Sequence, residues 1–414
     1  MELMEMQSFK QTKLGLIPES WDVYSVSEVF EVHNNKRLPI SEEVRCKIQG
    51  KYPYYGPTKI QDYINEYRFD GTFALIGEDG DHFLKWDKMR MTQLAKGKFN
   101  VNNHAHALKG TSKATTEWFY YFFGHRDITP YLTRQGAGRY KLTKATLLDL
   151  PCIVPPTLQE QKAIANALSD VDELISNLDQ LITKKKAIKQ GAMQQLLTPP
   201  HKGGKRLAGF TGEWVERKLG DIGEITGAGI DKKIIEGEKT VRLFNYMDVM
   251  KRDYVYNHEL NHEVTAPYSK IITCNVIEGD IFLTPSSELR TDIGVSAIAI
   301  EDMQGVVYSY HLYRLRYNIE INKYYGLYLL KTKQFLDQAE KMCEGSGKRY
   351  VVSMGKFRNM IVYLPKDVKE QEAIANILYD MDKEIEQLDG KKAKYQDIKQ
   401  GMMQELLTGK TRLV

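Results

Sequence analysis

The sequence predicts a mixed α/β protein in which two globular domains are separated by two long antiparallel α-helices, arranged as a pseudo-twofold, circular internal repeat. Two observations predict this fold class. IKQGAMQQLLT (188–198) returns 210 positions later as IKQGMMQELLT (398–408), and the match extends backwards without a gap to EQKAIANALSDVDELISNLD (160–179) and EQEAIANILYDMDKEIEQLD (370–389). A region of roughly 150 to 160 residues precedes each copy, which is the size of one domain.

The 414 residues are sufficient for two or three domains with sizeable cores. Residues 1–155 form the first predicted globular domain and residues 156–198 the first long helix. Residues 199–365 form the second globular domain, and residues 366–414 the second long helix with a tail. In this tail GKTRLV repeats the GGKRLAGF that follows the first helix, as if a third repeat were about to begin.

The two repeated segments have apolar residues at steps of four and three, which is the heptad stripe of a helix that packs along one face. The stripe residues are Ile164, Leu168, Val171, Ile175, Leu178 and Ile182 in the first copy and Ile374, Leu378, Met381, Ile385 and Leu388 in the second. Prolines before each segment and Thr-Pro-Pro or Thr-Gly after it mark helices of about 38 residues, about 57 Å long. We expect the copies to pack against each other and to run antiparallel, although Lys392 interrupts the second stripe where the first has Ile182.

Gly191 and Gly401 lie at the same place in the two predicted helices. A glycine inside a helix costs about 1 kcal/mol relative to alanine. Each glycine is therefore either tolerated or needed for the close approach of another backbone, from the sister helix or from a partner subunit.

The two globular domains match weakly but in order. FDGTFALIGEDG (69–80) corresponds to IEGDIFLTPSSE (277–288), where a glycine precedes a short strand and a polar turn. Each domain ends on a glycine-containing basic loop, QGAGRYKLT (135–143) and EGSGKRYVVS (344–353). These patterns predict mixed α/β domains.

Charge is concentrated locally, although the whole chain has a net charge of only +4. Residues 85–149 contain twelve basic and four acidic residues, and residues 303–365 contain ten and four, whereas residues 1–84 are acidic. Basic residues interleaved with aromatics and glycine loops are typical of surfaces that contact phosphates. A solvated charged face is the alternative, but it would have to occur twice at equivalent positions.

We find no motif for chemistry within this chain. HELNH (258–262) fits a zinc-protease pattern, but that pattern requires an amphipathic helix that the flanking residues do not predict. His104 and His106 lack a third ligand nearby, and GSGKR (345–349) lacks the spacing of a phosphate loop. The four cysteines are scattered singly, no signal peptide is visible, and no apolar run is long enough for a membrane helix. We therefore expect a cytoplasmic protein with no catalytic site, no metal site and no membrane contact.

The chain resembles the specificity subunit of type I restriction-modification systems. The resemblance depends on PCIVPPTLQEQKAIANAL (151–168) and its counterpart IVYLPKDVKEQEAIANIL (361–378), on the two helices that end in LLT, and on GDIFLTPSSELRTDIG (279–294). It covers essentially the full length in the order domain, helix, domain, helix.

The resemblance implies that each globular domain is a target-recognition domain that reads one half of an asymmetric, bipartite site on double-stranded DNA. It implies that the helices are a spacer and a docking platform for two methyltransferase subunits, joined by restriction subunits that translocate and cleave DNA. S-adenosylmethionine, ATP and Mg²⁺ would then be used by these partners, with no cofactor in this chain. The rivals are a coiled-coil adaptor that reads no DNA, and an enzyme with an unrecognised site.

Candidate residues follow from the chemistry of base and phosphate contacts, for which arginine, lysine and small polar side chains are suited. The DNA-binding candidates are Arg90, Lys98, Arg134, Arg139, Lys141, Ser287, Arg290, Arg314, Arg316, Lys348 and Arg349. Strand alternation also allows Arg314 and Arg316 to form surface ion pairs instead. The candidates for helix pairing or partner docking are Ile164, Leu168, Val171, Ile175, Leu178, Gly191, Ile374, Leu378, Met381, Ile385, Leu388 and Gly401.

Overall fold

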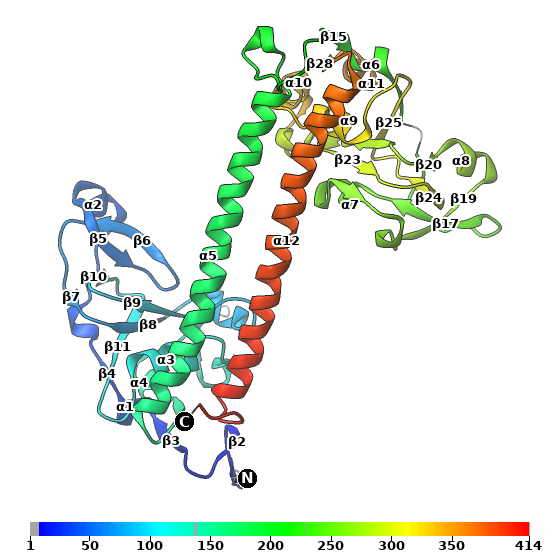
Figure 1. The fold of residues 1–414 in the computed structure, drawn as a ribbon. Coiled ribbons are helices and arrows are strands. Elements are labelled where there is room, and N and C mark those ends of the chain that lie inside the picture. The colour runs from blue at the N-terminus through cyan, green and yellow to red at the C-terminus, as the bar shows by residue number, and fades with distance from the viewer. Residues whose placement is uncertain (1–7, 136–138, 228, 414) are drawn as a thin grey trace, which may run out of the picture. The chain divides into compact units, whose positions relative to one another are not determined.

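The computed structural model describes residues 8–135, 139–227 and 229–413, which divide into two compact units. Unit 1 comprises residues up to Asp179 together with Gly390 onwards, and unit 2 comprises Gln180–Asp389. Each unit contains one globular domain and one half of each long helix, and Figure 1 labels their elements.

Unit 1 has two four-stranded sheets, in the strand orders β6-β5-β10-β7 and β4-β11-β8-β9, and three two-stranded pairs, β1-β2, β3-β14 and β12-β13. Its strands are β1 (Phe9–Thr12), β2 (Gly15–Pro18), β3 (Asp22–Ser25), β4 (Phe30–Val32), β5 (Gln49–Tyr55), β6 (Ile60–Ile64), β7 (Phe69–Asp70), β8 (Phe73–Gly77), β9 (Thr92–Ala95), β10 (Lys98–Val101), β11 (Ala105–Gly110), β12 (Thr133–Gln135), β13 (Arg139–Lys141) and β14 (Pro151–Val154). Its short helices are α1 (Val26–Val29), α2 (Glu42–Lys47), α3 (Thr116–Phe122) and α4 (Lys144–Asp149).

Unit 2 has a five-stranded sheet, β16-β25-β21-β23-β18, a four-stranded sheet, β19-β17-β24-β20, the pair β15-β28 and the small sheet β22-β27-β26. Its strands are β15 (Trp214–Lys218), β16 (Gly223–Thr226), β17 (Lys239–Phe244), β18 (Tyr254–Val255), β19 (Glu263–Ala266), β20 (Asn275–Val276), β21 (Ile281–Leu283), β22 (Ser286–Ser287), β23 (Ser296–Ala299), β24 (Met303–Tyr308), β25 (Tyr313–Tyr317), β26 (Glu344–Ser346), β27 (Arg349–Val351) and β28 (Ile361–Pro365). Its short helices are α6 (Leu219–Ile222), α7 (Tyr246–Lys251), α8 (Tyr268–Thr273), α9 (Lys323–Leu330), α10 (Lys333–Met342) and α11 (Met354–Arg358).

The two globular domains share one topology despite their weak sequence match. In each, one sheet has a parallel strand pair at its centre, β5 with β10 in unit 1 and β17 with β24 in unit 2. In each, a basic hairpin follows, β12-β13 or β26-β27. The closing strand then pairs with a strand near a tryptophan, β14 with β3 just after Trp21 and β28 with β15, which begins at Trp214. The prediction of two mixed α/β domains is confirmed. The order of the strands in the sheets could not be predicted from the sequence patterns.

The long helices are α5 (Leu158–Leu196) and α12 (Val368–Leu406), 39 residues each. Thr157 Oγ1 accepts the backbone N–H of Glu160 at 3.1 Å at the start of α5, and Gly409, with φ of +72°, follows the end of α12. A side-chain acceptor in the first turn and a left-handed glycine after the last are common helix boundaries. The division into the ranges 1–155, 156–198, 199–365 and 366–414 stays a prediction.

Within each unit, the two helix halves run antiparallel and are joined by ion pairs. In unit 1, Asp179 pairs with Lys392 and Asp172 pairs with Lys399, so partner numbers rise on α12 as they fall on α5. In unit 2 three lysines of α5 pair with three acids of α12, and these pairs are Lys185–Glu384, Lys186–Asp389 and Lys189–Asp382. The antiparallel prediction is confirmed inside each unit, and the pseudo-twofold relation stays a prediction.

The apolar stripe packs differently from the simple pairing that the sequence predicts. Ile164 and Leu168 are fully buried in the main core cluster of unit 1, where Trp118 of the globular domain and Leu406 of α12 also lie. In unit 2, Ile374 and Leu378 of α12 join the corresponding cluster, together with residues of α9 and β28. Each stripe therefore begins in the core of a globular domain rather than along the sister helix alone.

The segment that follows each helix binds the first turn of the other helix. In unit 2, Arg206 forms an ion pair with Glu370, whose side chain is fully buried, at 2.7 Å between Nη2 and Oε2. In unit 1, Arg412 forms the same pair with the fully buried Glu160, also at 2.7 Å between Nη2 and Oε2. The repeated GGKRL and GKTRL segments thus close equivalent contacts, as the circular repeat predicts.

The two helical glycines do not mark a close approach inside the chain. A Cβ built on Gly191 or Gly401 would meet no heavy atom within 4 Å. The sister-helix explanation is therefore wrong, because open space lies where its backbone would have to be. A tolerated glycine and the approach of a partner subunit remain.

Candidate nucleic-acid interface

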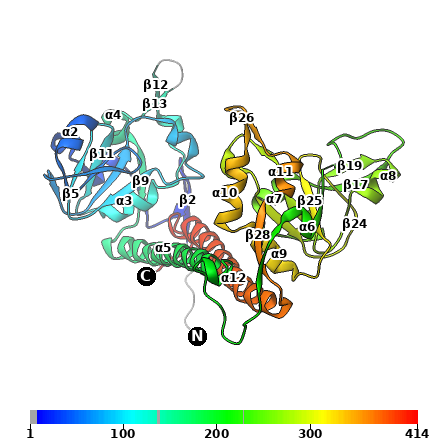
Figure 2. The ribbon, with the colours of Figure 1, turned by 90° about the horizontal axis from the view of Figure 1, so that it is seen from above.

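A groove of about 620 Å³ in unit 2 lies beside the basic hairpin. Its walls come from β22, from the turn between β26 and β27, from the start of α7 and from His311. β27 pairs with both β26 and β22, so the hairpin carries the groove on a three-stranded sheet. Figure 2 shows β26 beside α10 at the edge of this domain.

Four cations on this groove or its rim have no acidic partner among the described residues. They are Lys232, Arg290, Lys348 and Arg349. Arg349 Nη2 donates to Ser286 Oγ at 2.8 Å, and the Arg290 guanidinium lies 4.7 Å from the Tyr350 ring centroid. These neutral partners orient Arg349 and Arg290 without cancelling their charge. The four cations outnumber the two acids, Glu288 and Asp292, that also line the groove, so it favours anions.

Three of the six residues predicted in unit 2 line this groove, namely Ser287, Lys348 and Arg349, and Arg290 lies between the lining residues Leu289 and Asp292. Ser287 Oγ donates to Asp292 Oδ2 at 2.9 Å, which orients it within the wall. The structure brings these residues together from positions up to 62 apart in the sequence.

Arg314 and Arg316 are not at the groove, and we remove both from the predicted interface. Arg314 is 6% exposed and donates to the backbone oxygens of Thr273 at 3.3 Å and Asn275 at 2.8 Å. Arg316 makes a bidentate ion pair with the fully buried Asp280, at 2.6 and 2.7 Å. Burial and internal partners occupy the donors that a DNA contact would need, and for Arg316 the ion-pair alternative is confirmed.

In unit 1 the corresponding hairpin is β12-β13, which Figure 2 labels in this domain. Arg134 donates to the Tyr140 hydroxyl at 2.8 Å, and Lys141 Nζ lies 3.8 Å from Glu78 Oε1. Arg139 belongs to β13, but its side chain lies outside the described residues. Lys98 is the first residue of β10, at the end of this strand away from the hairpin. Its Nζ atom lies 4.4 Å from the Tyr67 ring centroid.

Arg90 serves an internal contact, so we remove it from the predicted interface too. Its Nη2 atom lies 3.4 Å from Asp172 of α5, and its guanidinium lies 4.2 Å from the Tyr120 ring centroid. Asp172 also accepts from the Tyr121 hydroxyl at 3.2 Å and pairs with Lys399. Arg90 therefore ties the domain to the long helices of unit 1.

Unit 2 contains the equivalent of this junction. Asp382 of α12 pairs with Lys189 and accepts from Tyr328 at 2.6 Å and Tyr254 at 2.8 Å. Burial raises the pKa of both tyrosines well above the usual value, so they stay protonated donors. We did not predict that Asp172 and Asp382 each bind a lysine and a tyrosine. The two aspartates lie 210 residues apart at matching places in the repeat, which was a visible signal.

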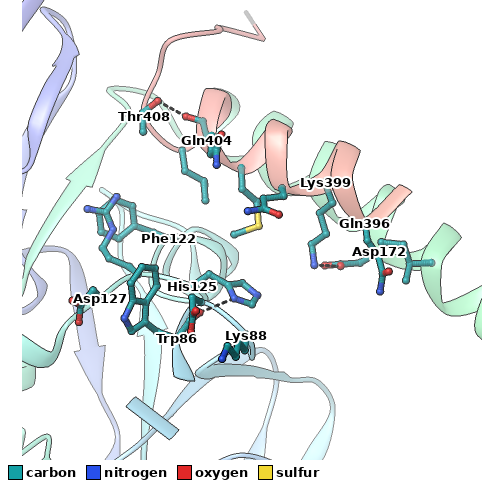
Figure 3. Close-up of a pocket in the computed structure, with 16 residues that line it drawn as sticks. Trp86, Lys88, Phe122, His125, Asp127, Asp172, Gln396, Lys399, Gln404 and Thr408 are labelled. Carbon is teal, nitrogen blue, oxygen red and sulfur yellow. Dashed lines mark hydrogen bonds and ion pairs between the residues drawn. The ribbon is translucent and has the colours of Figure 1, made fainter. Parts of the chain in front are cut away.

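A second cavity, of about 820 Å³, lies in unit 1 next to the Asp172–Lys399 ion pair (Figure 3). Figure 3 shows Trp86 and Phe122 on one side, Gln404 of α12 on the other, and the Lys399–Asp172 pair at its edge. His125 Nδ1 bonds the Trp86 carbonyl oxygen at 2.9 Å, and burial lowers the pKa of His125. None of the eleven predicted DNA-binding residues lines this cavity.

The structure offers no site for metal chemistry within the part of the chain that it describes. No three His, Cys, Asp or Glu side chains there group closely enough to hold a metal ion. HELNH lies on a short 3₁₀ helix, Asn257–Glu259, and the coil before β19, so its histidines do not share a helical turn. No described helix is long and apolar enough to cross a membrane.

His106 instead supports the unit 1 hairpin. Its side chain is 1% exposed, its Nε2 donates to the Leu142 carbonyl at 2.7 Å just after β13, and its Nδ1 accepts from Asn34 Nδ2 at 2.8 Å. Both nitrogens are used by a neutral ring, and burial lowers the pKa of His106.

This arrangement predicts a pH dependence for unit 1. The pKa of His106 is lower in the folded chain than in the unfolded chain, so the unfolded chain binds the proton first as the pH falls. The contribution of neutral His106 to the free energy of unfolding is therefore present above the ordinary pKa of 6.5 and is lost as the pH falls below it. We expect the free energy of unfolding of His106→Gln to fall less steeply between pH 6.5 and 5, by up to about 1.4 kcal/mol per pH unit. Hydrogen exchange in β11 at several pH values measures this, with the exposed His201→Gln as control; equal slopes in His106→Gln and the wild type would contradict it.

Comparison with known proteins identifies the family. The model of the type I restriction modification DNA specificity domain matches residues 18–190 and 211–395, which is most of the chain. The chain belongs to this family. The alternative of a scaffold without DNA specificity domains is not supported.

Two relatives of this specificity subunit illustrate the match. A putative type I restriction enzyme specificity subunit of Haemophilus influenzae is 37% identical over 151 residues, which are 36% of this chain and 37% of that one. The MjaVIII specificity subunit of Methanocaldococcus jannaschii is 24% identical over 100% of this chain and 98% of its own length.

Solved structures share the fold. The S subunit of a type I restriction-modification system from M. genitalium aligns with a TM-score of 0.61 and 17% identity, covering 93% of this chain and 96% of that one. A chain from a study of complex assembly and conformational transition in the type I R-M system aligns with a TM-score of 0.53 and 13% identity, covering 95% and 99%. The predicted fold class is confirmed.

Proposed function

We propose that each globular domain of this specificity subunit reads one half of an asymmetric, bipartite site on double-stranded DNA. The observation that carries the proposal is the unit 2 groove, where cations without acidic partners line the hairpin of a DNA specificity domain. Phosphate contacts set the position of such a domain, and base contacts set its sequence preference. The domain of unit 1 presents the same hairpin with different side chains, which supports unlike half-sites.

We further propose that the long helices hold the two domains apart and dock two methyltransferase subunits. On the part of α5 that lies in unit 2, Leu181 and Ile188 are seven residues apart and are 39% and 47% exposed. An exposed apolar heptad stripe is what a partner helix packs against in a coiled coil. The open space at Gly191 and Gly401 would allow that partner to approach closely.

The remaining partners follow from the same proposal. Restriction subunits that translocate and cleave DNA would join the core, in the cytoplasm, and the complex would methylate adenines. S-adenosylmethionine, ATP and Mg²⁺ would be used by those partners, as the resemblance to the family implies. This chain would supply binding and geometry rather than catalysis.

The test is DNA binding by the chain purified with its methyltransferase partner, using the DNA that the complex selects from a random-sequence library. We expect the Lys348→Ala, Arg349→Ala double variant to bind at least about tenfold more weakly, with a shallower salt dependence, because a phosphate contact and a base contact are lost. Arg217→Ala is the control, because Arg217 is an exposed arginine of unit 2 outside the groove. Unchanged affinity and salt dependence in the double variant, or failure of the wild-type complex to select any sequence, would contradict the proposal.

A further inference from the structure

One sheet position beside the basic hairpin is equivalent in the two domains. Asp79 bridges Lys141 in antiparallel fashion in unit 1, and Ser286 pairs with Val351 in the same way in unit 2. The residue after the paired strand residue donates its N–H to the carbonyl just before this position in both domains. The bonds are Leu142 to Glu78 at 2.7 Å in unit 1 and Val352 to Pro285 at 2.9 Å in unit 2. The register therefore matches Asp79 with Ser286, one residue away from the match that the sequence patterns suggest.

In unit 2 this position is neutral and leaves its arginine charged. Ser286 Oγ accepts one hydrogen bond from Arg349 Nη2 at 2.8 Å, and Arg349 is exposed on the hairpin. A hydroxyl orients the guanidinium but cannot neutralise it. An exposed, oriented guanidinium is the side chain that best matches the O6 and N7 acceptors of guanine.

In unit 1 the same position is acidic. The Asp79 carboxylate is 19% exposed and lies 3.3 Å from His104 Nδ1, while the neighbouring Glu78 is 2.9 Å from Arg37 Nη1. A carboxylate only accepts hydrogen bonds, so it favours the exocyclic amino group of cytosine or adenine and repels guanine O6. The position beside the hairpin is therefore neutral in unit 2 and acidic in unit 1.

We propose that the residue at this position sets which base its hairpin reads. Ser286 leaves Arg349 free to read a guanine in one half-site, whereas Asp79 directs the unit 1 hairpin to an amino-bearing base in the other. This inference rests on the proposed reading of bipartite DNA and names the residues that would distinguish its two halves.

The experiment compares the motifs that the complex of this chain with its methyltransferase selects from random-sequence DNA. We expect Ser286→Asp to place a carboxylate against Arg349 and to lower the preference for one guanine by about tenfold or more, in one half-site only. Ser286→Ala should keep that guanine, because the charge of Arg349 stays unneutralised. Asp79→Ser should change one base of the other half-site and leave the first unchanged.

Ser269→Asp is the matched control, because Ser269 is an exposed serine of unit 2 on α8, outside the groove. A motif that Ser286→Asp leaves unaltered would overturn the inference. So would an equal loss of affinity for all sequences, since that would place the side chain against phosphate. In either case a bipartite wild-type motif would leave the proposed function standing, whereas a wild-type complex that selects no motif would overturn the proposed function itself.

Discussion

Replacing Arg206 with leucine is expected to lower the free energy of unfolding of unit 2 by about 3 kcal/mol or more. Arg206 donates to both carboxylate oxygens of Glu370, at 3.1 and 2.7 Å, and the Glu370 side chain is fully buried. Without the guanidinium, the one donor that the described residues still offer the Glu370 carboxylate is Trp214 Nε1, at 3.2 Å. A buried carboxylate without a counter-charge is among the most costly defects in a folded protein.

A second substitution separates the charge from the packing. Glu370→Gln added to Arg206→Leu should restore much of the lost stability, because the neutral amide oxygen still accepts from Trp214. Denaturant unfolding followed by hydrogen exchange in β15 and β28 gives the value for unit 2 alone. Arg217→Leu, at an exposed arginine of β15, is the control. If the double variant is less stable than Arg206→Leu, the loss comes from packing and the electrostatic explanation is wrong.

The long helices could be predicted from the sequence because their signal is local. Apolar residues at heptad steps, a duplication without gaps and flanking prolines all lie within one segment, so they predict two long helices such as α5 and α12. Glu160 and Glu370 carried a weaker signal that was not used. A glutamate repeated in the first turn of both helices indicates a repeated polar contact, here Glu160 with Arg412 and Glu370 with Arg206.

The DNA-binding candidates could be predicted only in part, because the charge of a side chain does not reveal its partner. Arg316 forms an ion pair with Asp280, 36 residues away in the sequence, and Arg90 forms one with Asp172, 82 residues away. Such pairs depend on strand order, which periodicity does not determine. Lys348 and Arg349 stay predicted contacts, and they lie at the turn and at the first residue of the second strand of the hairpin β26-β27, where no described acid pairs with them.

Inserting one heptad into both long helices is expected to lengthen the gap between the two half-sites by about three base pairs. The insertion points are after Thr183 in α5 and after Asp389 in α12. Seven residues add about 10 Å at 1.5 Å per residue, and one DNA step is about 3.4 Å. They also rotate the helix by nearly two full turns, so the same face of each helix is kept.

This design keeps the contacts on both sides of the insertion. Asp172 and Asp179 still face Lys399 and Lys392 in unit 1, and Lys189 still faces Asp382 in unit 2, because each pair lies wholly on one side. Inserting four residues after Thr183 alone would instead slide the lysines of α5 past the acids of α12 and is expected to weaken assembly. Mapping methylated adenines in cells that carry the complete system gives the gap length directly. We expect the bases read by each domain to be unchanged and only the separation of the two half-sites to grow. A complex with the paired insertion that still methylates DNA at the original gap would show that the helices do not set the spacing.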